Sequence, residues 1–397
     1  MAAFLGLGDY WWQWGDLLFR FLHVIAGIAW IGASFYFIAL DNHLAPPADE
    51  QDAARGVGGE AWEIHGGGFY RVEKFRVAPP AIPEPLYWFK WEAYTTWLSG
   101  FALFIAVYYA HAHVYMIDPS VAHLTTWEAI GISAGGLVVA WIVYDLACRL
   151  LGANDRALAV VVAVFVVVSA WGMAQLLAPR AAYIEVGAML GTIMAANVFF
   201  VIIPAHRELI RAKEAGREPD PIWNERAKQR SVHNNYFTLP VLFAMLSNHF
   251  AFVYGHANAW IYLVAFMAIG AWIRHFFNLH HAGRNAWWIL ATSAAALVVI
   301  AVLLRPSSPS ASGPPPTEAQ VLAVLHLRCA PCHSLSPTEP GIDSPPAGIV
   351  LTDAARVDEL APLVDQEAVS SDAMPPGNVT GMTQAERDLL ARWIASR

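Results

Sequence analysis

The chain has 397 residues, of which 57% are hydrophobic and only 14% are charged. Soluble globular proteins carry about 25% charged residues, so this composition excludes an ordinary water-soluble fold, and its high hydrophobicity excludes intrinsic disorder. The net charge of −8 excludes a strongly basic nucleic-acid-binding protein. The 17 Trp residues are typical of the aromatic belts at membrane interfaces, so we expect an integral membrane protein.

Eight stretches are apolar and long enough to cross a membrane, since a spanning helix needs about 20 largely apolar residues. They cover residues 17–40, 95–116, 128–150, 157–178, 183–205, 236–255, 259–279 and 286–304. The count falls to seven if the first stretch lies only in the interface. We therefore predict an all-α fold in which residues 1–304 form a polytopic membrane helix bundle of about eight spans.

The Lys and Arg residues of this bundle gather in alternate loops. The loops after the first, third, fifth and seventh spans hold most of them, whereas the intervening loops hold only Arg180. Because Lys and Arg collect on the cytoplasmic side of a membrane, both ends of the chain should face outward. We expect a multi-pass protein of the bacterial inner membrane with both termini in the periplasm.

The composition changes after residue 304. Residues 305–317 are rich in Pro and Ser, which predicts a semi-rigid, extended linker. The chain after residue 304 contains no Lys, and its six Arg face eleven Asp and Glu. We therefore predict a separate, acidic, soluble domain at residues 318–397.

This soluble domain contains the sequence Cys329-Ala-Pro-Cys332-His333. Cys-x-x-Cys-His is the attachment site of a c-type haem: both thiols bond to the haem and the adjacent His coordinates the iron. The alternatives are a thioredoxin-like redox pair and a zinc site. No strand–helix alternation precedes the motif, and only His326 lies nearby as a further zinc ligand, so covalent haem c is the prediction.

The segments around this motif resemble a small class I cytochrome c. A capped amphipathic helix leads into the motif from Thr317, and another helix follows Met382. Between them lies Ala-Met374-Pro-Pro-Gly-Asn, and the resemblance implies that Met374 is the second axial ligand, with Met382 as the alternative. Thioether ligation raises the potential of haem iron, so the domain is suited to accept electrons.

The membrane domain holds most of the His residues, in two layers near its outer and inner faces. Facing His pairs can ligate a b-type haem, and His23 and His249 of the outer layer are the candidates. His23 lies inside the first span, where ionisable groups are costly and usually functional. A half-hydrated interfacial ring without a cofactor is the structural alternative.

Other stretches of the membrane domain combine aromatic, cationic and amide side chains. They are His65-Gly-Gly-Gly-Phe-Tyr-Arg-Val-Glu-Lys74, Trp88-Phe-Lys-Trp-Glu-Ala-Tyr-Thr-Thr-Trp97 and His233-Asn-Asn-Tyr-Phe-Thr-Leu-Pro240. Alternating aromatic and cationic groups suit a flat anionic ring, which stacks on aromatic side chains and pairs with Arg or Lys. An interfacial segment anchored by Trp and Lys is the alternative.

These stretches resemble the membrane domain of the bacterial membrane-bound cytochrome c-fused urate oxidases, and the resemblance extends through the linker to the cytochrome. It implies an oxidoreductase that converts urate to 5-hydroxyisourate and passes the electrons to its own cytochrome rather than directly to O₂. A respiratory oxidase or a soluble carrier would then accept the electrons. The alternative is a non-catalytic membrane subunit that carries cytochrome c for a partner dehydrogenase or respiratory complex.

Urate oxidation needs a base and a cation beside the urate anion. On the inner face the candidates are His65 and His233 as the base, and Lys74, Arg71 or Lys90 as the cation. An inner site would be separated from haem c by about 30 Å of bilayer, which implies an intermediate electron carrier such as the b-type haem. Alternatively, the urate site faces outward, among His111, His113 and His249.

Overall fold

The computed structural model describes residues 7–256, 258–305 and 313–397. The first part of the chain is mostly helical: α1 (Leu7–His43), α3 (Trp91–Phe104), α4 (Ala112–Tyr115), α5 (Thr126–Leu151), α6 (Asp155–Ala174), α7 (Pro179–Ala196), α8 (Ile203–Glu214), α9 (Pro221–Leu246), α10 (Ala251–Tyr254), α11 (Ala259–His281) and α12 (Trp288–Leu303). A small element between α1 and α3 contains α2 (Glu50–Ala54), β1 (Val57–His65) and β2 (Gly68–Phe75). The C-terminal part, here called the tail, contains α13 (Glu318–Val324), α14 (Ala354–Glu359), α15 (Ala361–Val364) and α16 (Gln384–Ala395).

Five helical segments of the described chain are long and apolar enough to cross a membrane: Trp14–His43, Thr126–Leu151, Asp155–Ala174, Pro179–Glu214 and Ala259–His281. The fourth joins α7 and α8 through a π-helical segment at Asn197–Ile202. The starts of these helices follow from local chemistry. Thr125 and Glu128 form a capping box before α5, and Pro179, which lacks a donor N–H, occupies the first turn of α7.

The other three expected spans differ from the prediction of about eight. The helix over 95–116 is interrupted at His111, whose φ of −123° and ψ of 36° are not helical. The helix over 236–255 ends at Leu246, and the first half of α9 carries charged and amide side chains. α12 has 16 residues, or about 24 Å at about 1.5 Å per residue, which is less than the hydrocarbon thickness of about 30 Å.

The all-α prediction also missed a two-stranded antiparallel sheet. Strands β1 and β2 pair Ile64 with Phe69 and His65 with Gly68. Gly66 and Gly67 form the turn between them with φ angles of 57° and 82°, which glycine adopts without steric cost. The glycine-rich part of the His65–Lys74 stretch is therefore the turn of a hairpin.

An ionic cluster holds this hairpin to α2. The Arg71 guanidinium forms ion pairs with Asp52, with Glu60 at 2.5 Å and with Glu73 at 3.4 Å. Arg55 adds a second ion pair to Asp52 at 2.5 Å. Hydrogen bonds from these two guanidinium groups hold the pKa of Asp52 below its usual value. The Arg71 predicted as an anion clamp is therefore already neutralised by this chain's own carboxylates.

Helix α7 lies at the centre of the membrane domain and packs against α5, α6, α9 and α11. Close approach is possible because Gly187 faces Ala244, where a Cβ on the glycine would lie 2.6 Å from the alanine Cβ. Glu185, in the middle of α7, is fully buried and accepts a hydrogen bond of 2.5 Å from Ser133. The packing of these helices places polar side chains inside an otherwise apolar core.

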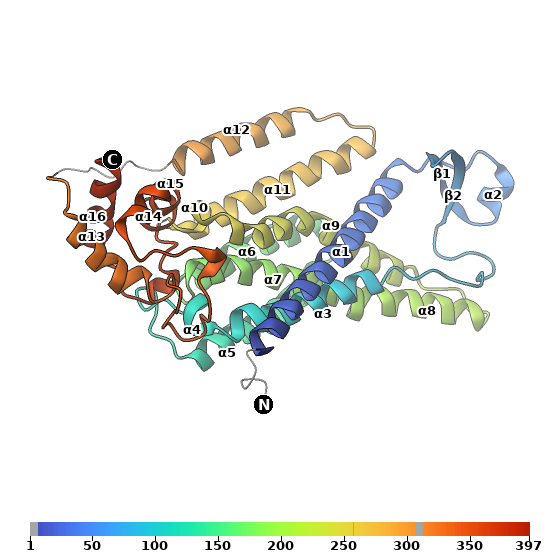
Figure 1. The fold of residues 1–397 in the computed structure, drawn as a ribbon. Coiled ribbons are helices and arrows are strands. Elements are labelled where there is room, and N and C mark those ends of the chain that lie inside the picture. The colour runs from blue at the N-terminus through green and yellow to red at the C-terminus, as the bar shows by residue number, and fades with distance from the viewer. Residues whose placement is uncertain (1–6, 257, 306–312) are drawn as a thin grey trace.

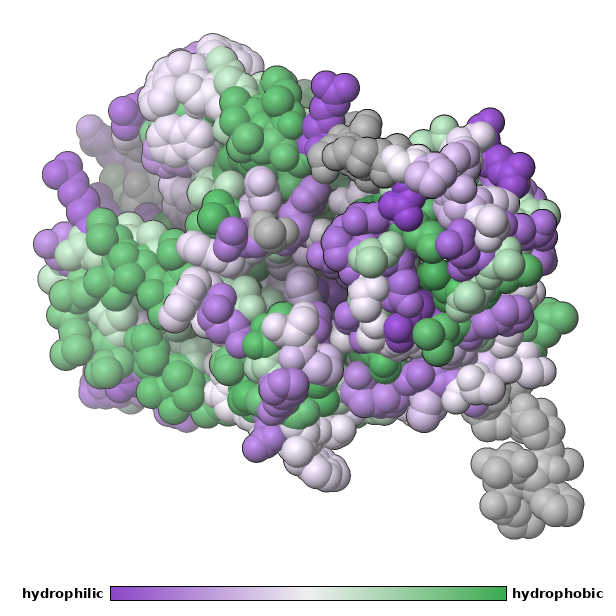
Figure 2. All heavy atoms as spheres, turned by 90° about the vertical axis from the view of Figure 1, so that its left-hand side faces the viewer, coloured by the Kyte–Doolittle hydropathy of each residue, from purple (hydrophilic) through white to green (hydrophobic). Residues whose placement is uncertain are grey.

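The tail has its own apolar core, in which Val321, Leu325, Val357, Leu390 and Trp393 are buried. In Figure 1 the tail and the N-terminal end of α1 lie at one end of the helix bundle, while the hairpin and the end of α8 lie at the other. Viewed from the tail end, hydrophilic side chains gather on one part of the surface and apolar side chains on another (Figure 2). Residues 306–312 of the predicted linker lie outside the described residues.

Backbone contacts fasten the tail to the membrane domain. Asp372 N–H donates to the Gly255 carbonyl at 3.2 Å, and the Pro340 carbonyl lies 2.8 Å from His113 Nε2. Gly377, with φ of 55°, approaches so closely that a Cβ there would lie 2.2 Å from the Ile117 carbonyl oxygen. The tail is thus docked on the segments around α4 and α10.

Candidate functional site

The Cys-x-x-Cys-His segment adopts a tight turn at the end of the tail's first helical segment. The amide of His333 donates to the Cys329 carbonyl at 2.8 Å. The His333 Nδ1–H donates to the Ile349 carbonyl at 3.0 Å, which fixes the tautomer and leaves Nε2 to bind iron. These donors and thiols fit covalent haem c, which would be held by Cys329, Cys332 and His333.

The two alternatives to haem fit this turn less well. Burial raises the pKa of both the Cys329 and the Cys332 thiols to about 11, whereas the reactive Cys of thioredoxin has a pKa of about 7. Among the residues that the structure describes, no group of three or more His, Cys, Asp or Glu side chains could hold a metal ion such as zinc. Haem c stays a prediction supported by the sequence and by the geometry of His333.

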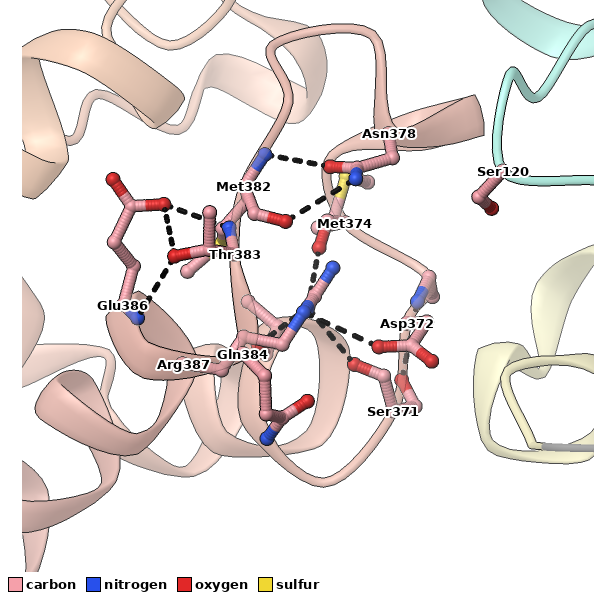
Figure 3. Close-up of polar contacts among 12 residues, drawn as sticks. Ser120, Ser371, Asp372, Met374, Asn378, Met382, Thr383, Gln384, Glu386 and Arg387 are labelled. Carbon is pink, nitrogen blue, oxygen red and sulfur yellow. Dashed lines mark hydrogen bonds and ion pairs between the residues drawn. The ribbon is translucent and has the colours of Figure 1, made fainter.

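The loop that carries Met374 is held in place by Arg387. This guanidinium is 4% exposed and donates to the carbonyls of Ala368 at 2.6 Å and Met374 at 2.9 Å. It also forms an ion pair of 3.2 Å with Asp372. Figure 3 shows Arg387 reaching toward this loop, with Ser120 of the membrane domain opposite. Met382, the alternative ligand, instead packs into the tail's apolar core.

The structure does not bring His65, Lys74 and His233 together. His65 is exposed at the end of β1, and Lys74 is exposed and forms an ion pair of 2.5 Å with Asp41. His233 lies in α9, and its Nδ1 is 2.7 Å from the Tyr144 hydroxyl. Each of the three has its own surroundings, so their catalytic roles stay predictions without a shared site.

His233 belongs to a buried polar network that joins α5, α7 and α9. Asn197 Nδ2 donates to the Tyr144 hydroxyl at 3.1 Å and to Asn234 Oδ1 at 2.8 Å. Arg230, 5% exposed, pairs with Asp145 at 2.6 Å. A mainly apolar cavity of about 1300 Å³ lies beside His233, between α6, α9 and α11. Sequence reasoning missed Tyr144, Asn197, Arg230 and Glu185, although polar residues within apolar segments are a usable signal.

The structure shows the surroundings of His23 and His249, the two outer-layer His residues predicted as b-type haem ligands. His23 Nδ1–H donates to the Thr96 carbonyl at 2.9 Å, and its ring packs where a Cβ on Gly100 would lie at 2.7 Å. His249 ends the short helical segment Ser247–His249. Neither His23 nor His249 lines the cavity beside His233 or the smaller cavity beside the tail that is described next. A b-type haem between them therefore stays a prediction.

A second cavity, of about 410 Å³, lies between the tail and the adjoining ends of α4, α7 and α11. We call it the interdomain cavity. Membrane-domain residues that line it include Tyr115, Arg180, Tyr254, His256 and Trp260. The tail contributes Asp372, Met374 and Arg387 among others. The loop with the expected iron ligand and the membrane domain therefore line one shared cavity.

Arg180 is the cation that the membrane domain contributes to this cavity. Its Nε donates to Asn248 Oδ1 at 3.3 Å, and the same oxygen accepts a 2.8 Å hydrogen bond from the Tyr108 hydroxyl. The guanidinium lies over the Tyr115 ring at 4.9 Å. In the described part of the chain Arg180 forms no ion pair with a carboxylate, and its contacts are with neutral groups.

The family described as urate oxidase N-terminal matches residues 9–305, which is more than half of the chain. The chain belongs to this urate oxidase family. No curated protein and no solved structure was found to match the chain.

Membership in the urate oxidase family confirms the urate oxidase relationship that the aromatic, glycine-rich and amide-rich stretches predicted. The matched residues include the His233 network and every membrane-domain residue of the interdomain cavity named above. They do not include the tail, so its cytochrome c character depends on the Cys329-x-x-Cys332-His333 sequence and on the geometry around it. Family membership also indicates a urate-related oxidoreductase.

Proposed function

We propose that the protein is an integral-membrane urate oxidase that converts urate to 5-hydroxyisourate and passes the electrons to haem c in its own tail. The observation that carries this proposal is that a bundle of the urate oxidase family and a haem c attachment sequence occur in one chain. Their docking around a shared cavity that includes Met374 supports electron transfer within the chain.

The reaction balances without O₂. Urate at neutral pH is a planar monoanion, and its oxidation removes two electrons and one proton to give dehydrourate. Water then forms a new C5–O bond, so urate monoanion and water yield 5-hydroxyisourate, one proton and two electrons. Haem c, when bound, accepts these electrons one at a time and passes them to a respiratory oxidase or a soluble carrier.

The chain's own residues would bind the haem and orient it. Cys329 and Cys332 would tether it, and His333, oriented by the Ile349 carbonyl, would bind the iron on one side. Met374 would bind on the other side, with its loop held by Arg387. Because a Met ligand raises the potential, this arrangement favours electron acceptance.

We further propose that the bundle spans the bacterial inner membrane with the tail in the periplasm. Five membrane-length helices support the first part. The concentration of Lys and Arg in the hairpin-end loops supports the second, since such loops face the cytoplasm. The tail and the start of α1 lie together at the opposite end (Figure 1).

The test is anaerobic addition of urate to the purified full-length protein in detergent. We expect the absorption bands of reduced haem c to develop while 5-hydroxyisourate forms. If dithionite reduces the haem but urate does not, the proposal is wrong and a non-catalytic electron-transfer subunit is favoured. Pyridine haemochrome analysis of the same sample reports directly whether b-type haem accompanies haem c.

A further inference from the structure

We propose that the interdomain cavity binds urate and that Arg180 is the cation that holds the anion. The inference rests on the proposed urate oxidase function and adds the location of the substrate. It places urate at the tail end of the bundle, rather than beside His65, Lys74 and His233 at the hairpin end.

The position of Arg180 in the sequence is the first observation. It is the only Lys or Arg in the loops on the side of the membrane that the charge distribution assigns to the tail. A cation there opposes the general bias of membrane proteins, and a buried charge is costly unless it is compensated. A cation retained at such a position therefore calls for an anionic partner.

Among the described residues no carboxylate forms a direct ion pair with Arg180, and Glu367 of the tail interacts with its charge only at longer range. Arg180 Nε donates to the amide oxygen of Asn248, and the Tyr115 ring lies under the guanidinium. The planar guanidinium carries five N–H donors, so it can bind an anion through two parallel hydrogen bonds. Urate presents oxygen and nitrogen atoms on the edge of a planar ring, which suits this donor geometry.

The acidic side chains that line the same cavity have other partners. Asp372 pairs with Arg387 at 3.2 Å. Asp118 accepts hydrogen bonds from the Ser120 hydroxyl at 2.6 Å and from the Ser120 amide at 2.9 Å. These carboxylates are therefore engaged within their own segments, and Arg180 stays available to an incoming anion.

The helix that carries Arg180 adds to the positive potential. α7 begins at Pro179, and its N-cap residue is Ala178, whose side chain provides no capping hydrogen bond. Ala178, Pro179 and Arg180 all line the cavity. The N-terminus of a helix carries a partial positive charge and unpaired N–H groups, which favour an anion beside it.

The size and walls of the cavity fit a planar purine. Its volume of about 410 Å³ lies within the range of about 300–1,000 Å³ that is typical of small-ligand pockets. Tyr115, Tyr254 and Trp260 provide aromatic walls on which a planar ring can stack. A cation beside aromatic faces is the combination that suits a flat anionic ring.

The location also shortens the electron path. Met374 lines the same cavity, so a bound urate would lie beside the loop that carries the expected iron ligand. A site at the hairpin end would instead require transfer across about 30 Å of bilayer. The interdomain cavity therefore removes the need for a second electron carrier.

The experiment measures the rate of haem c reduction against urate concentration, anaerobically, in the detergent-solubilised holoprotein. We expect Arg180→Gln to raise the half-saturating urate concentration by about tenfold to a hundredfold, as loss of a charged hydrogen-bonding partner does. Arg180→Lys keeps the charge but not the planar guanidinium with its parallel N–H donors, so it should raise the half-saturating urate concentration less. The haem content and dithionite-reduced spectrum of each variant establish that it is folded.

Arg226→Gln is the matched control, because Arg226 is an exposed cation that lines the cavity beside His233. We expect this variant to keep the wild-type half-saturating urate concentration.

Two results would overturn the inference and leave the urate oxidase function intact. One is an unchanged half-saturating urate concentration in folded Arg180→Gln, and the other is a large increase in Arg226→Gln. If Arg180→Gln does not fold, Tyr115→Leu replaces it, with an increase expected and an unchanged value contradicting the site. Failure of urate to reduce the wild-type haem would instead overturn the proposed function itself.

Discussion

Cationic side chains at the two ends of the helix bundle have different partners. At the hairpin end, Arg71, Lys74 and Arg230 each pair with a carboxylate of this chain. At the tail end, Arg180 contacts an amide oxygen and an aromatic ring instead. The first group is neutralised by the fold, whereas Arg180 lines a cavity and retains its charge for a ligand.

Arg274 sharpens the comparison because it is more deeply buried than Arg180 and likewise has no ion pair in the described part of the chain. Its Nε and Nη2 donate to Asn235 at 2.9 Å and Asn278 at 3.2 Å, and the Phe35 ring covers it at 4.0 Å. It lines neither of the two cavities. A cation without an ion pair therefore does not by itself indicate a ligand site; Arg180 differs in that it lines a cavity together with Met374, the predicted iron ligand.

The largest effect is expected from removing the haem tether at the tail end. Cys329→Ser/Cys332→Ser should abolish covalently bound haem and, with it, all urate-driven haem c reduction, because no thioether can form. Haem staining of denaturing gels and anaerobic spectra measure both. The helical circular dichroism of the membrane domain should be retained. Covalent haem in this double variant would show that the attachment site was misassigned.

The second effect concerns the choice between Met374 and Met382. Met374→Ala should retain covalent haem but lower its midpoint potential by on the order of 0.1 V or more, within the roughly 0.8 V that axial ligands span. Redox titration measures this shift. Met382→Ala is the control, and it should destabilise the tail's core without a comparable change in potential. The reverse pattern would identify Met382 as the ligand.

The third effect should separate structural cations from the ligand-binding one. Asp145→Ala removes the carboxylate that pairs with buried Arg230, and leaving such a charge unpaired typically costs about 3–5 kcal/mol. Thermal unfolding of the detergent-solubilised protein should show a lower Tm. The half-saturating urate concentration of the folded fraction should not change, in contrast to Arg180→Gln. A large increase in that concentration would link the hairpin end to urate binding.

The smallest effect should be confined to the hairpin. Arg55 and Arg71 lower the pKa of Asp52 in the folded protein, so this contribution to stability is complete above the usual Asp pKa of about 3.9 and is lost as pH falls through the lowered value. Hydrogen exchange at β1 and β2 should therefore be faster in Asp52→Asn than in wild type at neutral pH. The difference should shrink at strongly acidic pH. An equal exchange rate at neutral pH would contradict the role of this cluster.

Local patterns predicted much of the fold, and long-range packing explains what they missed. Apolar stretches located the five membrane-length helices, and the sequence predicted the first and last helices of the tail, α13 after Thr317 and α16 after Met382. The hairpin was missed because the pairing of β1 with β2 depends on contacts between residues on different strands, which the pattern of either strand alone does not show. The break at His111 follows the π-helical segment Ile105–Tyr109 and lies beside Gly341 of the tail, and the apolar pattern predicted neither feature.

The candidate site was predicted less well than the fold. The haem c prediction needs only the contiguous Cys329-x-x-Cys332-His333 sequence, whereas the interdomain cavity combines Tyr115, Arg180, Trp260 and Met374 from four separate segments. Arg180 was visible as an exception to the charge distribution. Its significance depended on the tail packing against α4 and α10, which charge and hydropathy patterns do not predict.

The most direct test places urate on one side of a membrane. Sealed anaerobic vesicles are prepared with the tails facing outward, and urate, an anion that crosses bilayers slowly, is added outside. We expect urate to reduce haem c immediately, and to reduce the same fraction of it that dithionite reduces. Reduction only after detergent opens the vesicles would place the urate site at the hairpin end, and no reduction even then would contradict urate oxidation by this protein.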